Sequence, residues 1–148
     1  GNIEEVDSEN SIYNENIAAL YVSYIKSYPL TLDAAIACYS WGLLYDNNRL
    51  LKIFYPLYQE EISDSLFIKT GSNTYTAKGN FYFEGQFFVT GNTLKLETMT
   101  PELSLVAAEQ LADNLHNEKI NVILFHLDEV ILNKYSNEDL EAIYNCFE

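Results

Sequence analysis

The chain has 148 residues, of which 48% are hydrophobic, and 22 acidic residues against 8 basic ones give it a formal net charge of −14. This length and apolar content exclude a globally disordered chain and suit one domain with a hydrophobic core. The charge and the single arginine, Arg49, exclude direct binding to nucleic acid and disfavour an anionic membrane surface, because both need clustered lysine and arginine.

The chain is expected to begin with a polar segment and then a helix. Residues 1–10 are polar and acidic, so we expect a frayed start. Apolar residues at helical spacing then predict a helix from about Ser11 to Ser27. Pro29 ends this helix, because the residue before a proline avoids the helical region of backbone conformation.

The segment from Leu32 to Tyr45 is apolar nearly all round. Its apolar residues recur at helical spacing, Thr31 suits the N-cap position, and Asp33 suits the first turn. We therefore predict a central helix that is buried on several sides and too short to span a membrane, which takes about 20 apolar residues. The alternative is a ligand pocket beside Cys38, lined by the aromatic side chains Tyr39, Trp41 and Tyr45.

The middle of the chain changes from helical to strand periodicity. Residues 46–48 indicate a turn, and about Arg49 to Tyr55 are predicted to form a third helix. Four segments rich in aromatic and β-branched residues then predict an antiparallel meander of three or four strands. These segments are residues 66–70, 74–78, 81–90 and 93–98.

The longest of these predicted strands, residues 81–90, has a glycine at its centre. Gly85 inside a strand indicates a bulge or the close approach of another backbone. If the alternation continues through it, four apolar side chains share one face of the strand. They are Phe81, Phe83, Phe87 and Val89.

The C-terminal third is expected to be mainly helical. Thr100, Pro101 and Glu102 supply a cap, a first-turn proline and an acid, and so predict a helix to about Leu115. The segment from Ile120 to Leu132 fits either a helix or a buried strand, since short apolar runs do not separate the two, and we favour the helix. A last helix begins at Ser136, with Asp139 placed for a capping box.

Together these elements predict an α+β fold in which N-terminal helices, a three- to four-stranded antiparallel meander and C-terminal helices follow one another. No linker divides the chain, so residues 1–148 are expected to form a single domain. No signal peptide is present, which favours the cytoplasm, while export after removal of a leader is the alternative.

The sequence shows no recognisable catalytic, metal or cofactor motif. It has no nucleophile elbow and no glycine-rich phosphate loop, so enzymatic activity is the less favoured interpretation and no cofactor is expected. Cys38 and Cys146 lack the spacing of a metal or redox pair, so we expect buried free thiols. His126 lies near Asp128 and Glu129, but one such group is weak support for a metal site.

Acidic residues form stripes on two of the predicted C-terminal helices. The first helix carries Glu102, Glu109 and Asp113, and the last carries Glu138, Glu141 and Glu148. If the helices are neighbours, these stripes make a continuous anionic surface that could dock onto a cationic protein. The alternative is a solvated face that keeps the protein soluble.

We therefore favour a small acidic protein that binds a basic protein partner and blocks or escorts it, in the manner of immunity proteins, inhibitors or nucleic-acid mimics. The second hypothesis is a non-catalytic small-ligand-binding or accessory domain with an aromatic pocket near Trp41. The third is an enzyme, which predicts a buried cluster of titratable groups with shifted pKa values.

Overall fold

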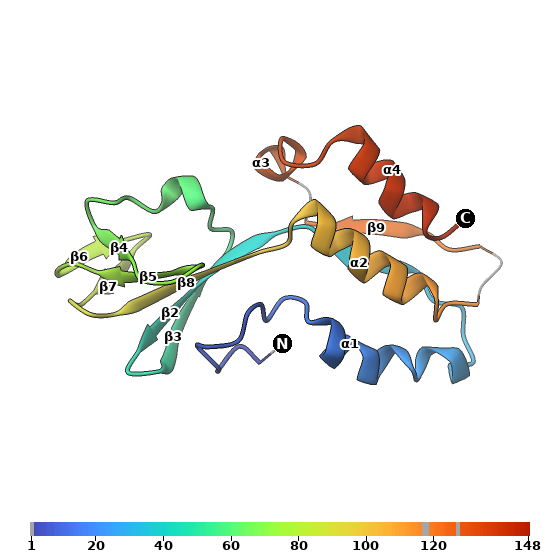
Figure 1. Cartoon of the computed structure of the whole chain (residues 1–148), viewed down its shortest axis with the longest axis horizontal. Coiled ribbons are helices and arrows are strands. Elements are labelled where there is room, and N and C mark those ends of the chain that lie inside the picture. The colour runs from blue at the N-terminus through green and yellow to red at the C-terminus, as the bar shows by residue number, and fades with distance from the viewer. Residues whose placement is uncertain (1, 117–118, 127) are drawn as a thin grey trace. The chain divides into compact units, whose positions relative to one another are not determined.

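A computed structural model of the chain describes residues 2–116, 119–126 and 128–148 (Figure 1). Its fold is mixed α+β, with helices and a mostly antiparallel sheet. The chain forms two compact units, and each is built from separate stretches of sequence. The helical unit comprises residues 12–39 and 99–148, and the sheet unit comprises residues 2–11 and 40–98.

The sheet unit contains an antiparallel sheet of five strands in the spatial order β3-β2-β8-β5-β4. A separate hairpin, β6–β7, and a short 3₁₀ helix, Gln59–Glu61, complete the unit. The strands are β2 Ser40–Asp46, β3 Arg49–Phe54, β4 Phe67–Lys69, β5 Thr74–Ala77, β6 Phe81–Phe83, β7 Gln86–Phe88 and β8 Thr93–Thr98.

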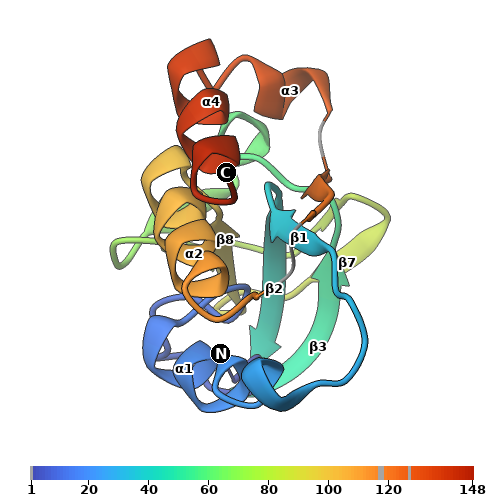
Figure 2. The same ribbon diagram turned by 90° about the vertical axis from the view of Figure 1, so that its right-hand side faces the viewer.

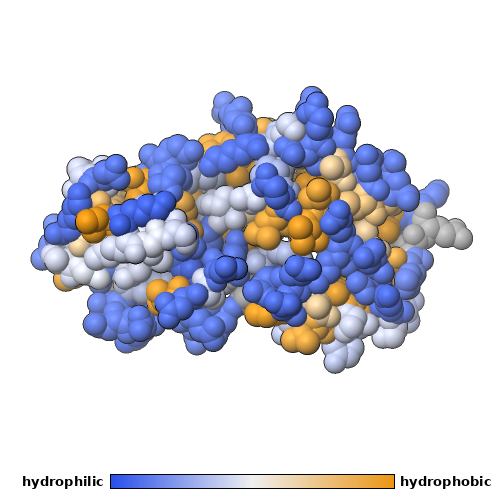
Figure 3. All heavy atoms as spheres, viewed as in Figure 1, coloured by the Kyte–Doolittle hydropathy of each residue, from blue (hydrophilic) through white to orange (hydrophobic). Residues whose placement is uncertain are grey.

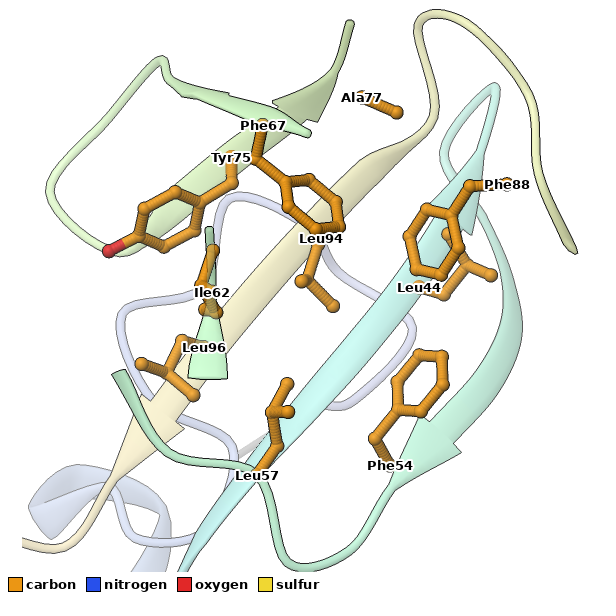
Figure 4. Packing of buried hydrophobic residues seen from close by; sticks show 10 residues of the cluster. All are labelled: Leu44, Phe54, Leu57, Ile62, Phe67, Tyr75, Ala77, Phe88, Leu94 and Leu96. Atoms are coloured by element: carbon orange, nitrogen blue, oxygen red, sulfur yellow. The ribbon is translucent and has the colours of Figure 1, made fainter. Parts of the chain in front are cut away.

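The core of the sheet unit lies on one face of this sheet (Figure 4). Leu44 of β2 and Leu94 of β8 are opposite one another in the sheet and are fully buried. The rings of Phe54 and Phe67 pack against the ring of Phe88 from the hairpin, with centroids 5.9 and 5.4 Å away. This aromatic packing anchors the hairpin to the sheet.

Gly42 of β2 allows the buried Leu57 side chain to approach the sheet. A Cβ at this position would lie 2.2 Å from Leu57 Cδ2 and 3.2 Å from Leu94 Cδ1. We expect Gly42→Ala to lower the free energy of unfolding by about 1–3 kcal/mol, because a closely packed core accommodates an added methyl only through strain. Urea unfolding followed by Trp41 fluorescence measures this loss. Gly79→Ala is the control, since its Cβ would meet no atom within 4 Å; equal stability of the two variants would contradict the prediction.

The opposite face of the sheet is covered by residues 2–11, the segment expected to be frayed. Lys95 Nζ donates to the Ser8 carbonyl oxygen, and Tyr45 Oη donates to the Ile3 carbonyl oxygen at 2.7 Å. Asn73 Nδ2 donates to the Glu9 carbonyl oxygen at 3.2 Å. The N-terminal segment is thus hydrogen-bonded to three positions of the sheet unit.

The helical unit combines two strands with four α-helices in the part of the chain that the structure describes. β1 (Ala34–Ala37, labelled in Figure 2) and β9 (Val122–Phe125, labelled in Figure 1) pair in parallel, in the register Ala34 to Val122. The α-helices are α1 Glu15–Val22, α2 Pro101–Ala112, α3 Glu129–Leu132 and α4 Asn137–Asn145, and a 3₁₀ turn, Ile25–Ser27, follows α1.

Helices α2 and α4 begin where the sequence predicts. Thr100 Oγ1 accepts a hydrogen bond from the backbone N–H of Leu103 at 3.2 Å, and Pro101 occupies the first turn. Ser136 and Asp139 form the predicted capping box, with Oγ accepting from the Asp139 N–H at 3.1 Å and Oδ2 accepting from the Ser136 N–H at 2.8 Å. Local side-chain chemistry fixes these two starts.

The prediction of a central helix from Leu32 to Tyr45 is wrong, because this segment forms strands β1 and β2. Residues 42–45 of β2 are buried on both faces of the strand. Both faces therefore carry apolar residues, and such a continuous apolar run also fits the spacing of a helix. The predicted third helix is likewise wrong and is strand β3. Asn47 and Asn48, with φ of 47° and 63°, form the tight turn that joins β2 to β3.

The predicted single strand over residues 81–90 is instead the hairpin β6–β7. Glu84 and Gly85, with φ of 47° and 69°, form its turn, so Gly85 serves a turn rather than a bulge. The turn changes the alternation after it: Phe88 is buried, whereas Phe87 and Val89, predicted to share a face with Phe81 and Phe83, are exposed.

Two further boundaries differ from the predictions. The segment from Ile120 to Leu132 contains strand β9 and the short helix α3 rather than one helix, and Leu127 lies outside the described residues. One α-helix, α1, precedes the first strand instead of the several N-terminal helices predicted, and it is shorter than Ser11 to Ser27. The order of elements is therefore matched only in part.

Candidate functional site

Helices α2 and α4 lie side by side in the helical unit (Figures 1 and 2). Each turns small or apolar residues inward, with Ser104 and Ala108 of α2 and Ile143 of α4 fully buried. Ser104 Oγ lies 2.7 Å from Tyr135 Oη, which donates to the Met99 carbonyl oxygen at 3.2 Å. These buried hydrogen bonds hold the first turn of α2 against Tyr135, which directly precedes the N-cap of α4.

The acidic residues predicted to form the stripes lie on the exposed surfaces of these two helices. Glu102 and Glu109 are on α2, and Asp113 is its C-cap. Glu138 and Glu141 are on α4. Each of these five side chains is exposed, and we call them together the acidic face. The acidic face thus places five carboxylates on two helices that are packed against each other.

The charges of Glu102, Glu109 and Asp113 act on the pKa values of two residues that flank α4. Burial raises the pKa of the Cys146 thiol at the C-cap of α4, and the charges of Glu109 and Asp113 raise it further. The pKa of Tyr135 is also raised, first by burial and in smaller part by Glu102 at the other end of α2. Figure 1 shows α2 and α4 running side by side in the same direction, so the α2 stripe lies on a helix that is packed along α4.

The helix ends add to this negative potential. Glu109 and Asp113 lie in the last turn and cap of α2, and the C-terminal ends of α2 and α4 lie on the same side of the helical unit (Figure 1). Neither helix has a basic residue in its last turn, although the C-terminal end of a helix dipole favours cations. Two helix dipoles and the acidic side chains thus concentrate negative potential at one place.

Ion pairs do not neutralise the acidic face. In residues 2–116, 119–126 and 128–148, no lysine, arginine or histidine forms an ion pair with Glu102, Glu109, Asp113, Glu138 or Glu141. Asp139, by contrast, accepts hydrogen bonds from Ser136, and these bonds lower its pKa. Its carboxylate therefore serves the helix start, whereas the carboxylates of the acidic face remain available to a cation.

Tyr39, Trp41 and Tyr45, the residues expected to line an aromatic pocket, are divided between the two units. Tyr39 belongs to the helical unit, where its ring meets the Phe125 ring edge-on at 6.0 Å. Trp41 and Tyr45 belong to the sheet unit, and each is hydrogen-bonded there: Trp41 Nε1 donates to Glu97 Oε2 at 2.8 Å. Burial and the nearby charge of Glu97 raise the pKa of Tyr45 to about 12.

The sheet unit contains a buried ion pair that the sequence did not reveal. Lys95 Nζ lies 2.8 Å from Glu97 Oε1, and both residues are 1% exposed. Glu97 Oε2 accepts from Trp41 and from the backbone N–H and hydroxyl of Ser11. Burial acts to raise the pKa of Glu97, but the hydrogen bonds from Lys95, Ser11 and Trp41 outweigh it and lower the pKa overall.

The N-terminal segment accounts for the burial of this pair. Lys95 and Glu97 are two positions apart on β8 and therefore lie on the same face of the strand. The pattern TLKLET predicts that this polar face points to solvent. The N-terminal segment covers that face instead, through the bonds of Ser8 and Ser11. Both charged groups are thus used within the sheet unit, and we assign the pair to stability.

The described part of the chain contains neither a cluster of possible metal ligands nor a membrane-spanning helix. No group of three or more histidine, cysteine or acidic side chains there is placed to hold a metal ion. His126 Nε2 lies 3.9 Å from Asp128 Oδ2, and both cysteines are free, with Cys38 buried. None of the helices in the described residues is long and apolar enough to cross a bilayer.

Comparisons with known proteins do not indicate a role for the acidic face. No protein family, curated protein or solved structure matches this chain.

Proposed function

We propose that the acidic face of α2 and α4 binds a basic surface on a protein partner and thereby blocks or escorts that partner. The class includes immunity proteins, inhibitors and nucleic-acid mimics. One observation carries the proposal: α2 and α4 lie side by side and run in the same direction, with Glu109 and Asp113 at the end of α2 and no basic residue in either last turn. A cation brought to this place is attracted by side chains and helix dipoles together.

The charge of the whole helical unit supports the same proposal. Its two stretches hold twelve acidic residues against three lysines, which gives a formal net charge of −9 out of −14 for the chain. Like charges in one small unit repel each other and lower its stability. A cationic partner relieves this repulsion on binding and is steered toward the face before contact.

The alternative, a small-ligand pocket beside Trp41, has less support. The indole N–H of Trp41 and the hydroxyl of Tyr45 already donate hydrogen bonds within the sheet unit. A ligand that used either donor would have to replace a bond to Glu97 or to the Ile3 carbonyl oxygen.

The test is affinity capture from the source cells at low salt, followed by titration calorimetry of the purified partner at two salt concentrations. A five-site variant converts the acidic face to the corresponding amides: Glu102, Glu109, Asp113, Glu138 and Glu141. We expect a basic partner whose affinity falls at least about 10-fold in this variant and falls again with salt, because the lost contacts are electrostatic.

The control removes the same number of charges from exposed acidic residues of the sheet unit. These are Glu4, Asp7, Glu9, Asp64 and Glu84. Unchanged binding by this control supports the acidic face as the site. Equal loss in both five-site variants would assign the effect to net charge alone, and equal binding by all three proteins would reject the proposal.

A further inference from the structure

A groove opens in the helical unit between α1, β1 and α2, and its volume is about 210 Å³. Its lining is mainly apolar, with Ala18 and Val22 from α1 and Ala107 and Leu111 from α2. Ala35 of β1 also lines it and is exposed, so the groove is open to solvent along the strand. Patches of apolar residues accordingly lie over α1 and α2 in Figure 3.

The outer edge of β1 borders this groove. The backbone N–H groups of Ala34 and Cys38 donate to β9, at the carbonyl oxygens of Asn121 and Phe125. In a parallel ladder, alternate residues direct their backbone groups to opposite sides, so Ala35 and Ala37 direct theirs away from β9. The Ala37 carbonyl oxygen confirms this direction, since it accepts from Ser104 Oγ of α2 at 3.1 Å.

Ala35 has no such partner on this edge. None of the hydrogen bonds made by described side chains or loops involves its N–H or its carbonyl oxygen. Both groups lie at the apolar groove, on a strand edge that can pair with another strand. A small apolar ligand would fill the groove but would leave these two polar groups unsatisfied.

Helix α1 forms the opposite side of the groove and is weakly held by its own unit. It has no buried residue, and Leu20 and Tyr21 are 66% and 71% exposed. Its start is tied to α2, where Gln110 Nε2 donates to the Glu15 carbonyl oxygen at 2.9 Å and Tyr13 Oη donates to Gln110 Oε1 at 2.8 Å. A helix held at one end can accommodate a segment entering between it and β1.

A carboxylate stands near the groove. The charge of Glu15 adds to burial in raising the pKa of Tyr13, which lines the groove. Asp33 also precedes β1, but its Oδ1 accepts hydrogen bonds from the backbone N–H and the side-chain amide of Asn121, at 3.0 and 2.9 Å, on the β9 side. A segment seated in the groove therefore has the negative charge of Glu15 near it, within a unit of net charge −9.

We propose that an extended segment of a partner protein pairs with the outer edge of β1, between β1 and α1, with small or apolar residues facing the groove and lysine or arginine flanking them. Such strand addition uses the backbone groups of Ala35 for affinity and the groove for selectivity. This surface is separate from the acidic face, and the proposal does not depend on the proposed function.

The probe is a display library of random 12-residue peptides, selected on the full chain, with the enriched peptide then synthesised for fluorescence anisotropy. Ala35→Pro removes the outward N–H while leaving the hydrogen bonds of Ala34 and Cys38 to β9. Val122→Pro makes the same change on the outer edge of β9 and is the matched control. Ala18→Phe fills the groove from α1 and remains informative if Ala35→Pro does not fold.

We expect enriched peptides with alternating apolar residues and basic flanks, and at least about a 10-fold loss of affinity in Ala35→Pro and Ala18→Phe but not in Val122→Pro. Amide exchange should show the Ala35 N–H protected only when peptide is bound. No enriched peptide, or equal binding by Ala35→Pro, Ala18→Phe and the native chain, overturns the proposal. A dimer in light scattering that Ala35→Pro abolishes overturns it in favour of a second copy as occupant.

Discussion

Replacement of Glu97 by alanine is expected to lower the free energy of unfolding by about 3–5 kcal/mol, the range typical of breaking a buried ion pair. The variant leaves the Lys95 ammonium group at 1% exposure without its carboxylate. It also removes the acceptor of the Trp41 indole and of Ser11, so the N-terminal segment loses a contact with β8. Urea unfolding followed by Trp41 fluorescence measures the loss.

The matched variant replaces both charges, with Lys95→Met and Glu97→Leu together. We expect it to be much less destabilised than Glu97→Ala, because it buries no unpaired charge. If the single and double variants lose the same stability, the cost lies in the hydrogen bonds to Trp41 and Ser11 rather than in the ion pair. A loss below about 1 kcal/mol in both would contradict the importance of this buried group.

The same pair gives the stability of the chain a defined dependence on pH. The pKa of Glu97 is lower in the folded chain than its ordinary value, which is about 4.3 in an unfolded chain. The stability that results is fully present above the unfolded pKa and is lost as the pH falls through the folded pKa. The difference in unfolding free energy between the native chain and Glu97→Ala should therefore narrow below about pH 4.

The second large effect is expected at Phe88, whose replacement by alanine should cost about 3–5 kcal/mol. Its side chain is fully buried, and its ring contacts those of Phe54, Phe67, Phe81 and Phe83 at centroid distances of 5.4–5.9 Å. Alanine would leave a cavity between the hairpin and the sheet. Loss of this ring therefore weakens both the core and the attachment of β6–β7.

Phe87 provides the control one residue away. Its side chain is 43% exposed and meets mainly the Tyr82 ring, at 5.1 Å, so Phe87→Ala should cost less than about 1 kcal/mol. Thermal unfolding of the two variants compares them directly. A larger loss for Phe87→Ala than for Phe88→Ala would mean that the strand alternates as the sequence first predicted, without the turn at Glu84 and Gly85.

Sequence predicted the helices that have local start signals. The caps Thr100 and Ser136 satisfy backbone N–H groups within three residues, so no distant part of the chain is needed to predict them. Turns were predictable for the same reason, and Asn47–Asn48 is one of them. The α+β class followed from these signals and from the aromatic, β-branched middle segments.

Strand β1 was mistaken for a helix because its partner is distant in sequence, and β2 was mistaken although one of its two partners, β3, follows it directly. β1 pairs with β9, where Ala34 meets Val122, and β2 pairs with β8, where Leu44 meets Leu94. Burial on both faces of β2 removes the polar–apolar alternation that identifies a strand. Tertiary pairing thus decided the conformation of a segment whose local pattern fitted a helix.

Some features of the candidate surfaces could likewise be predicted from local sequence, whereas others depend on contacts between distant residues. The exposed positions of Glu102 and Glu109 followed from helical spacing, but the packing of α2 beside α4 did not. The Lys95–Glu97 pair was missed because charged residues on a strand predict exposure, whereas residues from the distant N-terminal segment cover this pair. The edge of β1 was missed because the segment was predicted to be a helix.

The interleaved order of the two units determines which of them a ribosome completes first. Every residue of the sheet unit lies before residue 99, whereas β1 of the helical unit waits for β9 at Val122–Phe125. During synthesis, residues 12–39 therefore form a loop between two stretches of the sheet unit until β9 has been made. This order favours folding of the sheet unit first, as the chain is synthesised. The helical unit folds last, because its strands β1 and β9 are far apart in the sequence.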